Sequence, residues 1–161
     1  MGSSTAGFHR WRGHRSSGQA TGAGVQFLKG AVLFSLGGTA YMLVEYIWRG
    51  YSHWSMGIVG GLCFVLMGAI NEFFPRSTPL WIQCVIAAVL ITLVEFVSGC
   101  ILNLWLHWDI WDYTGMFGNI LGQVCVPYMV AWLFLSAGGI VLDDVCRWKL
   151  FGEERPRWRV F

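Results

Sequence analysis

Four long apolar stretches, separated by short polar segments, dominate the hydropathy pattern of this chain. A helix that crosses a lipid bilayer needs about 20 mostly apolar residues. The stretches that meet this requirement run from about Phe27 to Trp48, from Trp54 to Phe73, from Leu80 to Leu104 and from Ile120 to Leu142. The pattern therefore predicts an all-α membrane protein with four transmembrane helices, arranged as two helical hairpins.

The connections between these stretches differ in character. Pro75 and Pro79 bracket a short turn between the second and third stretches, which are therefore predicted to run antiparallel. The segment LWLHWDIWDYTGMFGN, residues 104–119, is too polar to cross a membrane and too aromatic to be a plain loop. We expect it to be an interfacial segment between helices 3 and 4, or a lid, lying in the headgroup layer.

The composition and the distribution of charge agree with this arrangement. Only 12% of residues are charged, about half the share of a typical soluble domain. With four spans, ten of the eleven Lys and Arg residues fall on one side of the membrane, and Arg49 alone falls on the other. Because basic residues favour the cytoplasmic side, both termini are predicted to be cytoplasmic. The predicted domains are a flexible basic arm at 1–25, a transmembrane domain at 26–151 and a charged cytoplasmic tail at 152–161.

A short motif occurs twice. The run LVEY at Leu43–Tyr46 matches LVEF at Leu93–Phe96, and a His-Trp pair follows each run, at His53-Trp54 and at His107-Trp108. The chain would then consist of two hairpins with the same orientation, related by an axis along the membrane normal. A chance match is the alternative.

Two carboxylates lie inside the predicted spans, Glu45 and Glu95. Ionisable groups at such depth usually face protein or water and not lipid. Glu45 has Arg49 one helical turn further on, which predicts either an ion pair that seals the helix end or part of a site. Glu95 has no basic neighbour on its helix, so it could be protonated, pair with Arg49 across the bundle, or bind a cation. Since Arg49 cannot fully serve both carboxylates, a functional site is indicated here.

Polar and aromatic residues gather on the same side of the membrane. One interpretation is a vestibule that binds a cation through carboxylates and ring faces. The other is an interfacial aromatic belt with a few helix caps, for which Asp112 and Asn119 are suited. The candidate substrate-binding or gating residues are Glu45, Arg49, His53, Trp54, Glu95, Asn103, Trp111, Asp112, Tyr113, Asn119 and Gln123.

The sequence contains no motif that indicates a metal site, a cofactor or catalysis. The five cysteines contain no C-x-x-C pair, and the carboxylates and histidines lack the usual spacings of metal ligands. The chain has no Walker A, G-x-G-x-x-G or G-x-S-x-G motif. We therefore expect no catalytic residue, no cofactor and no metal. Nucleic-acid binding is not indicated either, because the basic residues follow the membrane topology.

At the opposite side, acidic residues are followed by basic ones at helical spacing. Arg76 lies four residues after Glu72, and Arg147 lies four after Asp143 and three after Asp144. We predict interfacial salt bridges, with a docking surface for a cytoplasmic partner as the alternative. Small residues in the second and fourth stretches indicate close helix contacts. Since four helices enclose little space, a homodimer is expected if the protein moves a solute.

Several motifs together resemble a known family. They are VEYIWRGYSHWSM, LVEFVSGCILN, WDIWDY and GNILGQVC, within residues 32–151. They are similar to the bacterial CmpB-like membrane permeases, the family called Putative ABC-transporter type IV. The resemblance implies the membrane-embedded part of a transporter in the bacterial plasma membrane, working with a separate cytoplasmic ATPase. The family motifs carry over Ser52, Asn71 and Gly99 in addition to the candidate residues above.

The leading hypothesis is therefore a membrane transport component whose site around Glu45, Arg49 and Glu95 faces outward and binds or gates the solute. The alternative is a non-transporting membrane scaffold or sensor in which the buried charges are structural. An intramembrane enzyme that acts on lipid through Glu and His is a third, weaker hypothesis.

Overall fold

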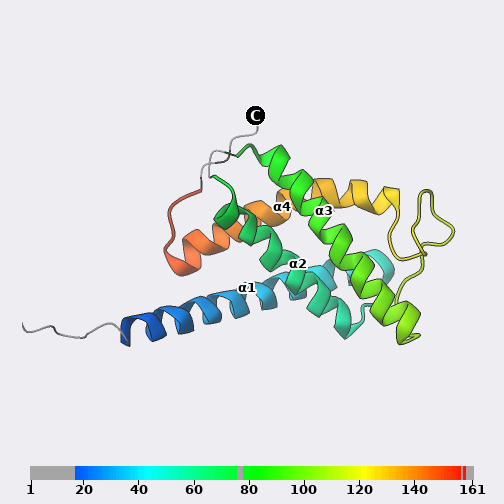
Figure 1. Ribbon diagram of the computed structural model, residues 1–161, viewed down its shortest axis with the longest axis horizontal. Coiled ribbons are helices and arrows are strands. Elements are labelled where there is room, and N and C mark those ends of the chain that lie inside the picture. The colour runs from blue at the N-terminus through cyan, green and yellow to red at the C-terminus, as the bar shows by residue number, and fades with distance from the viewer. Residues whose placement is uncertain (1–16, 76–77, 157, 159–161) are drawn as a thin grey trace, which may run out of the picture.

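A computed structural model describes residues 17–75, 78–156 and 158 of the chain, and these residues form helices joined by irregular segments (Figure 1). The elements are α1 (Ser17–Arg49), α2 (Trp54–Phe73), α3 (Leu80–Gly99), the π-helical η1 (Cys100–Trp105) and α4 (Val126–Phe151). The basic residues before Ser17, and Arg76 with its predicted bond to Glu72, lie outside the described residues.

Four candidate membrane spans are present in the described residues: Gly22–Arg49, Trp54–Phe73, Leu80–Trp105 and Val126–Phe151. Each is long and apolar enough to cross a bilayer. The predicted all-α membrane fold with four transmembrane helices is therefore confirmed. The orientation of the termini stays a prediction.

Two span boundaries differ from the predicted ones. The first helix begins at Ser17, and its candidate span begins at Gly22 and not at about Phe27. The fourth begins at Val126 and not at Ile120. Ile120 and Val124 form an isolated antiparallel bridge, and Pro127 occupies the first turn of α4. Since proline suits the first turn of a helix but not its interior, the helix starts here.

The helices pack as two pairs, with α1 mainly against α2 and α3 mainly against α4, while α2 contacts both α3 and α4. This agrees with the predicted hairpins. Glycines bring α1 and α2 close together. A Cβ atom at Gly38 would overlap the backbone oxygen of Gly57, and one at Gly60 would overlap the Tyr41 side chain. In lipid, where apolar burial between helices gains little, such close backbone packing is a main source of association.

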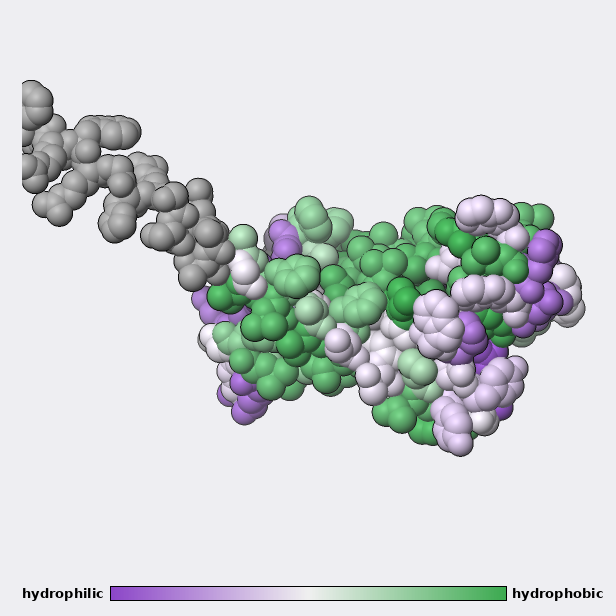
Figure 2. Space-filling view, turned by 90° about the horizontal axis from the view of Figure 1, so that it is seen from below, coloured by the Kyte–Doolittle hydropathy of each residue, from purple (hydrophilic) through white to green (hydrophobic). Residues whose placement is uncertain are grey.

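The apolar side chains fall into an inner and an outer set. Leu33, Phe64 and Ile140 are buried at the centre of the bundle, whereas Phe27 and Phe134 are largely exposed. Figure 2 shows a broad hydrophobic surface between two ends at which hydrophilic residues gather. This distribution fits a bundle whose outer face contacts lipid.

The two ends of the bundle differ. At the end called here the charged end, Lys29 of α1, Glu72 of α2 and Arg147 of α4 come together with Glu153. At the other, called the loop end, the segment 106–125 lies against the ends of α1 and α3 (Figure 1). The interfacial segment predicted between helices 3 and 4 is thus present at one end of the bundle.

The contact between α1 and α2 gives a first prediction. We expect Gly38→Ala to lower the free energy of unfolding by roughly 1–3 kcal/mol, because the backbone oxygen of Gly57 cannot rotate away from the new methyl group. Thermal unfolding in detergent, followed by tryptophan fluorescence, measures this. The control is Gly138→Ala, whose Cβ atom meets nothing within 4 Å. Equal melting temperatures for the two variants would contradict the close α1–α2 contact.

Candidate functional site

Glu45 is bound on both carboxylate oxygens near the end of α1. One oxygen forms an ion pair with Arg49, and the other accepts a hydrogen bond from Ser52 Oγ. Arg49 also donates from Nη1 to the backbone oxygen of Ile110, at 3.3 Å. The ion pair expected from the sequence is present, and it connects α1 to the segment 106–125.

Glu95 is only 4% exposed, and it is held by neutral donors. Tyr113 donates its hydroxyl to Oε1 at 3.1 Å, and Trp132 donates Nε1–H to Oε2 at 2.9 Å. Among the described contacts, Arg49 binds Glu45 and Ile110, so the alternative in which it pairs with Glu95 is not found. Glu95 thus connects α3 to α4 through Trp132 and to the loop through Tyr113.

The two donor rings are positioned by other rings. Tyr113 stacks on Tyr128 with ring centroids 4.6 Å apart, and Trp132 stacks on Tyr41 with centroids 6.0 Å apart. Burial raises the pKa of the Tyr113 phenol, and the nearby Glu95 carboxylate raises it further. The phenol therefore keeps its proton across the physiological range and remains a hydrogen-bond donor to Glu95.

Asn103 forms the centre of a second, uncharged junction. Its Nδ2 donates to the backbone oxygen of Trp111 at 3.0 Å and to Oε1 of Gln123 at 2.8 Å. Its Oδ1 accepts from the backbone N–H of Ile110 at 2.8 Å. Gly99 makes room for this junction, since a Cβ atom there would lie 2.5 Å from Gln123 Oε1. The amide of Asn103 thus joins both arms of the loop to η1, the segment that follows α3.

The π-helical segment η1 carries Asn103 and was not expected from the sequence. Its wider turns are marked by the bond from Leu106 N–H to the Ile101 oxygen, five residues back. Such segments are frequent at functional sites. No residue pattern in this stretch distinguishes it from an ordinary α-helix, so the sequence offered no signal for it.

The remaining loop residues brace the segment internally. Trp111 is buried and donates Nε1–H to the Gln123 oxygen at 2.9 Å. Asp112 accepts from the backbone and hydroxyl of Thr114, and Asn119 accepts from the backbone N–H of Gly122. The expectation that Asp112 and Asn119 cap helices is therefore wrong. Both brace turns within the loop, because α4 starts further along the chain.

The two His-Trp pairs meet at the loop end. The ring of His53 lies 5.4 Å from that of Trp54 and 5.5 Å from that of Trp108, centroid to centroid. His53 also caps α2, since its side chain accepts from the backbone N–H of Ser55. His107 has an exposed side chain and a left-handed backbone with φ of 55°. In the part of the chain that the structure describes, no group of three or more His, Cys, Asp or Glu residues could hold a metal ion.

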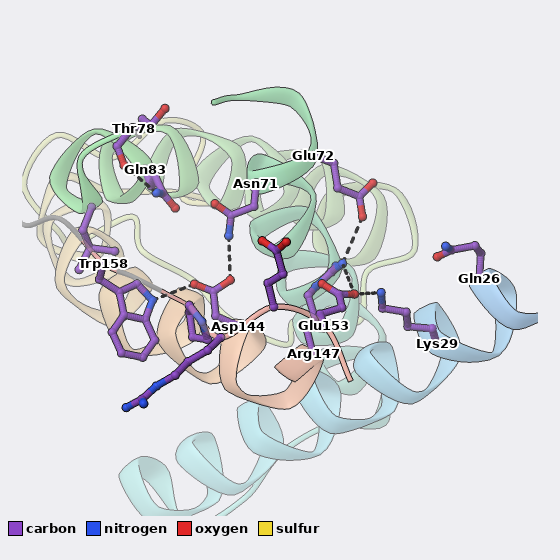
Figure 3. A pocket seen from close by; sticks show the side chains of 14 residues that line it. Gln26, Lys29, Asn71, Glu72, Thr78, Gln83, Asp144, Arg147, Glu153 and Trp158 are labelled. Carbon is purple, nitrogen blue, oxygen red and sulfur yellow. Dashed lines mark hydrogen bonds and ion pairs between the residues drawn. The ribbon is translucent and has the colours of Figure 1, made fainter. Parts of the chain in front are cut away.

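A cavity of about 1240 Å³ lies at the charged end (Figure 3). At its edge Arg147 donates to Asp143 at 2.6 Å and to Glu72 at 3.1 Å. Asn71 donates to Asp144 at 2.8 Å. The helical bond between Asp143 and Arg147 agrees with the prediction, whereas the cavity was missed, because it forms only when the four helices and the tail come together.

A family model described as Putative ABC-transporter type IV matches residues 25–145, most of the chain. The chain belongs to this family. The matched region contains every candidate residue of the loop end, and it stops just before Arg147. No curated protein and no solved structure matches the chain.

In this member of the family described as Putative ABC-transporter type IV, the Asn103 junction gives the second prediction. We expect Asn103→Ala to lower the free energy of unfolding by roughly 2–4 kcal/mol, because the Ile110 N–H and Gln123 Oε1 lose partners in a buried place. Thermal unfolding and the rate of proteolysis within 106–125 measure the effect.

The control is Asn119→Ala, which removes the same group from an accessible turn, with an expected loss of about 1 kcal/mol or less. Equal losses for the two variants would show that the junction does not hold the loop.

Proposed function

We propose that this protein is a membrane-embedded transport component in which the segment 106–125 is a closed gate at the loop end. The observation that carries the proposal is the use of both carboxylates that lie inside the candidate spans. Glu45, through Arg49, and Glu95, through Tyr113, each bind this one segment. The cavity at the opposite, charged end is the open part of the path. The candidate residues of the loop end therefore act in gating.

The strength of the contacts suits a gate. Hydrogen bonds between a neutral donor and a carboxylate contribute about 1.5–3 kcal/mol each. Inverting a closed-to-open ratio from 99:1 to 1:99 takes about 5.5 kcal/mol of differential binding. The free-energy cost of breaking two hydrogen bonds, the one from Tyr113 to Glu95 and the one from Arg49 to Ile110, is comparable with this value. A bound solute or a partner protein can supply such an amount.

The sidedness and the partners belong to the same proposal. Lys29, Arg147, Lys149 and Arg155 lie at or near the charged end, and the positive-inside rule then makes this end cytoplasmic. By the same rule both termini would be cytoplasmic, and a separate ATPase would dock on that side. Four helices alone enclose little space, so a transport component of this size would work as a homodimer. The membrane in question is the bacterial plasma membrane.

One observation favours a second candidate, a non-transporting scaffold or sensor. Glu45 and Glu95 each have both oxygens bound by the protein's own groups. Full internal satisfaction is the usual state of buried polar groups that serve stability alone. A transport component loses or changes solute flux when a carboxylate is neutralised without loss of the fold, whereas a scaffold changes only in stability.

The Glu95→Gln variant separates the two candidates. Membrane vesicles from cells that express the wild-type chain or this variant are loaded with ATP and incubated with a mixture of isotope-labelled metabolites. Mass spectrometry then measures the solute content of the vesicles. We expect a solute whose flux depends on the wild-type chain and changes at least fivefold in Glu95→Gln. The melting temperature should fall only slightly, since the amide keeps the shape of the carboxylate and one acceptor oxygen.

The control is Asp109→Asn, which neutralises an exposed carboxylate of the same segment and should leave the flux unchanged. If no solute depends on the chain and Glu95→Gln alters stability alone, the scaffold interpretation replaces the transport interpretation.

A further inference from the structure

Glu95 is a buried carboxylate that the described residues bind without a positive charge. It is 4% exposed, and its described partners are the Tyr113 hydroxyl at 3.1 Å and the Trp132 indole N–H at 2.9 Å. A charge in the apolar part of a membrane is costly unless it is paired. The ionised form of Glu95 is therefore stabilised only by hydrogen bonds from two neutral donors, and uptake of a proton would remove the cost of the charge.

Other titratable and charged groups lie around Glu95. Those that the structure describes are Tyr41, Glu45 and Arg49 of α1, Cys63 of α2, Tyr128 of α4 and Tyr113 of the loop. Arg49, the one cation among them, is bound to Glu45 and to the Ile110 oxygen. The helix α3 carries no acidic or basic residue besides Glu95. Since phenols and thiols are mostly neutral near pH 7, none of these described groups balances the charge of Glu95.

The two partners of Glu95 differ in the protonation that they allow. An indole N–H only donates, so Oε2, which faces Trp132, is best kept as an acceptor. A phenol hydroxyl can donate or accept, so Tyr113 can turn its hydroxyl and accept a hydrogen bond from a proton on Oε1. A proton taken up by Glu95 therefore belongs on Oε1, the oxygen that faces the segment 106–125.

Protonation at this oxygen changes the contact between α3 and the loop. A hydrogen bond to an ionised carboxylate is about twice as strong as one between neutral groups. Uptake of a proton replaces the stronger bond with the weaker one at the contact between Glu95 and Tyr113. The bond from Trp132 connects α3 to α4 and not to the loop. A proton on Glu95 thus weakens the attachment of the segment 106–125.

We propose that Glu95 is a proton-binding site that controls the gate. Its ionised form holds the segment 106–125 closed through Tyr113, and a proton from water at the loop end releases the segment. A fall in pH at this end then favours opening. The inference rests on the proposed function, because it assigns the ligand that regulates the same gate.

The first measurement is the protonation of Glu95 itself. Difference infrared spectroscopy follows the purified full-length protein in detergent between about pH 8 and about pH 5. In this range exposed carboxyl groups, with ordinary pKa values near 4, stay ionised. We expect a carboxylic C=O band that appears as the pH falls and is missing from Glu95→Gln.

The second measurement is the attachment of the segment. Hydrogen–deuterium exchange of the amides in 106–125 is compared at each pH with exchange in the unfolded chain, which corrects for the chemical pH dependence of exchange. We expect protection in the wild-type segment to fall roughly fivefold from about pH 8 to about pH 5, because one hydrogen bond loses about half of its strength. Protection in α2 should change little.

Variants assign the pH dependence to one residue. In Glu95→Gln the amide can donate to Tyr113 and accept from Trp132, as the protonated carboxyl group does. We therefore expect low protection of the segment at every pH. Asp109→Asn, His107→Gln and His53→Asn change other titratable groups of the loop end, and each should keep the pH dependence. Asn at position 53 can still cap α2.

Three results would overturn the proposal. They are the absence of a carboxylic band that depends on Glu95, pH-dependent protection that persists in Glu95→Gln, and loss of the pH dependence in a histidine variant. Failure of the gate itself looks different, since the amides of 106–125 would then exchange at every pH as fast as in the unfolded chain. A protected segment whose protection does not change with pH would leave the gate in place and remove only its control by protons.

Discussion

The structure depends on one constraint: a polar group placed among apolar helices must find its partner within the protein, because lipid offers none. Glu95 and Asn103 are such groups, and both are almost fully buried. Their partners come largely from outside the helix that carries them, from the segment 106–125 and from α4. The segment is therefore part of the packed structure and not a loose covering. Its conformation is fixed by the side chains that it satisfies.

The same constraint explains the difference between the two ends. At the loop end, hydrogen bonds connect α1 and η1 to the segment 106–125, and α3 to α4. At the charged end, the ion pairs of Arg147 and Lys29 lie around a cavity and leave it open. Charges there can be solvated, so complete internal pairing is not required. This difference between the ends is an observation on which the proposed transport function rests, in a chain that belongs to the family described as Putative ABC-transporter type IV.

The sequence predicted the parts of the fold that depend on local pattern. Apolar length located the four spans, and i to i+4 spacing predicted the bond between Glu45 and Arg49. Contacts between distant segments could not be predicted in this way. Nothing in the sequence near Glu95 indicates that Trp132 and Tyr113 are its donors, or that Asn103 meets Gln123. The hydropathy pattern carries no information on how distant segments pack or on the conformation of the loop. For this reason it did not predict the cavity, the π-helical turn or the late start of α4.

Packing of the segment 106–125 over the loop end can be tested most directly with a native thiol. Cys125 lies at the junction of this segment with α4 and is 1% exposed. Its modification by a water-soluble maleimide, followed by peptide mass spectrometry, reports opening of the segment. We predict slow modification in the wild-type protein and at least tenfold faster modification in Tyr113→Phe, at a similar melting temperature. Modification of wild-type Cys125 as fast as in the unfolded chain would contradict a closed loop end.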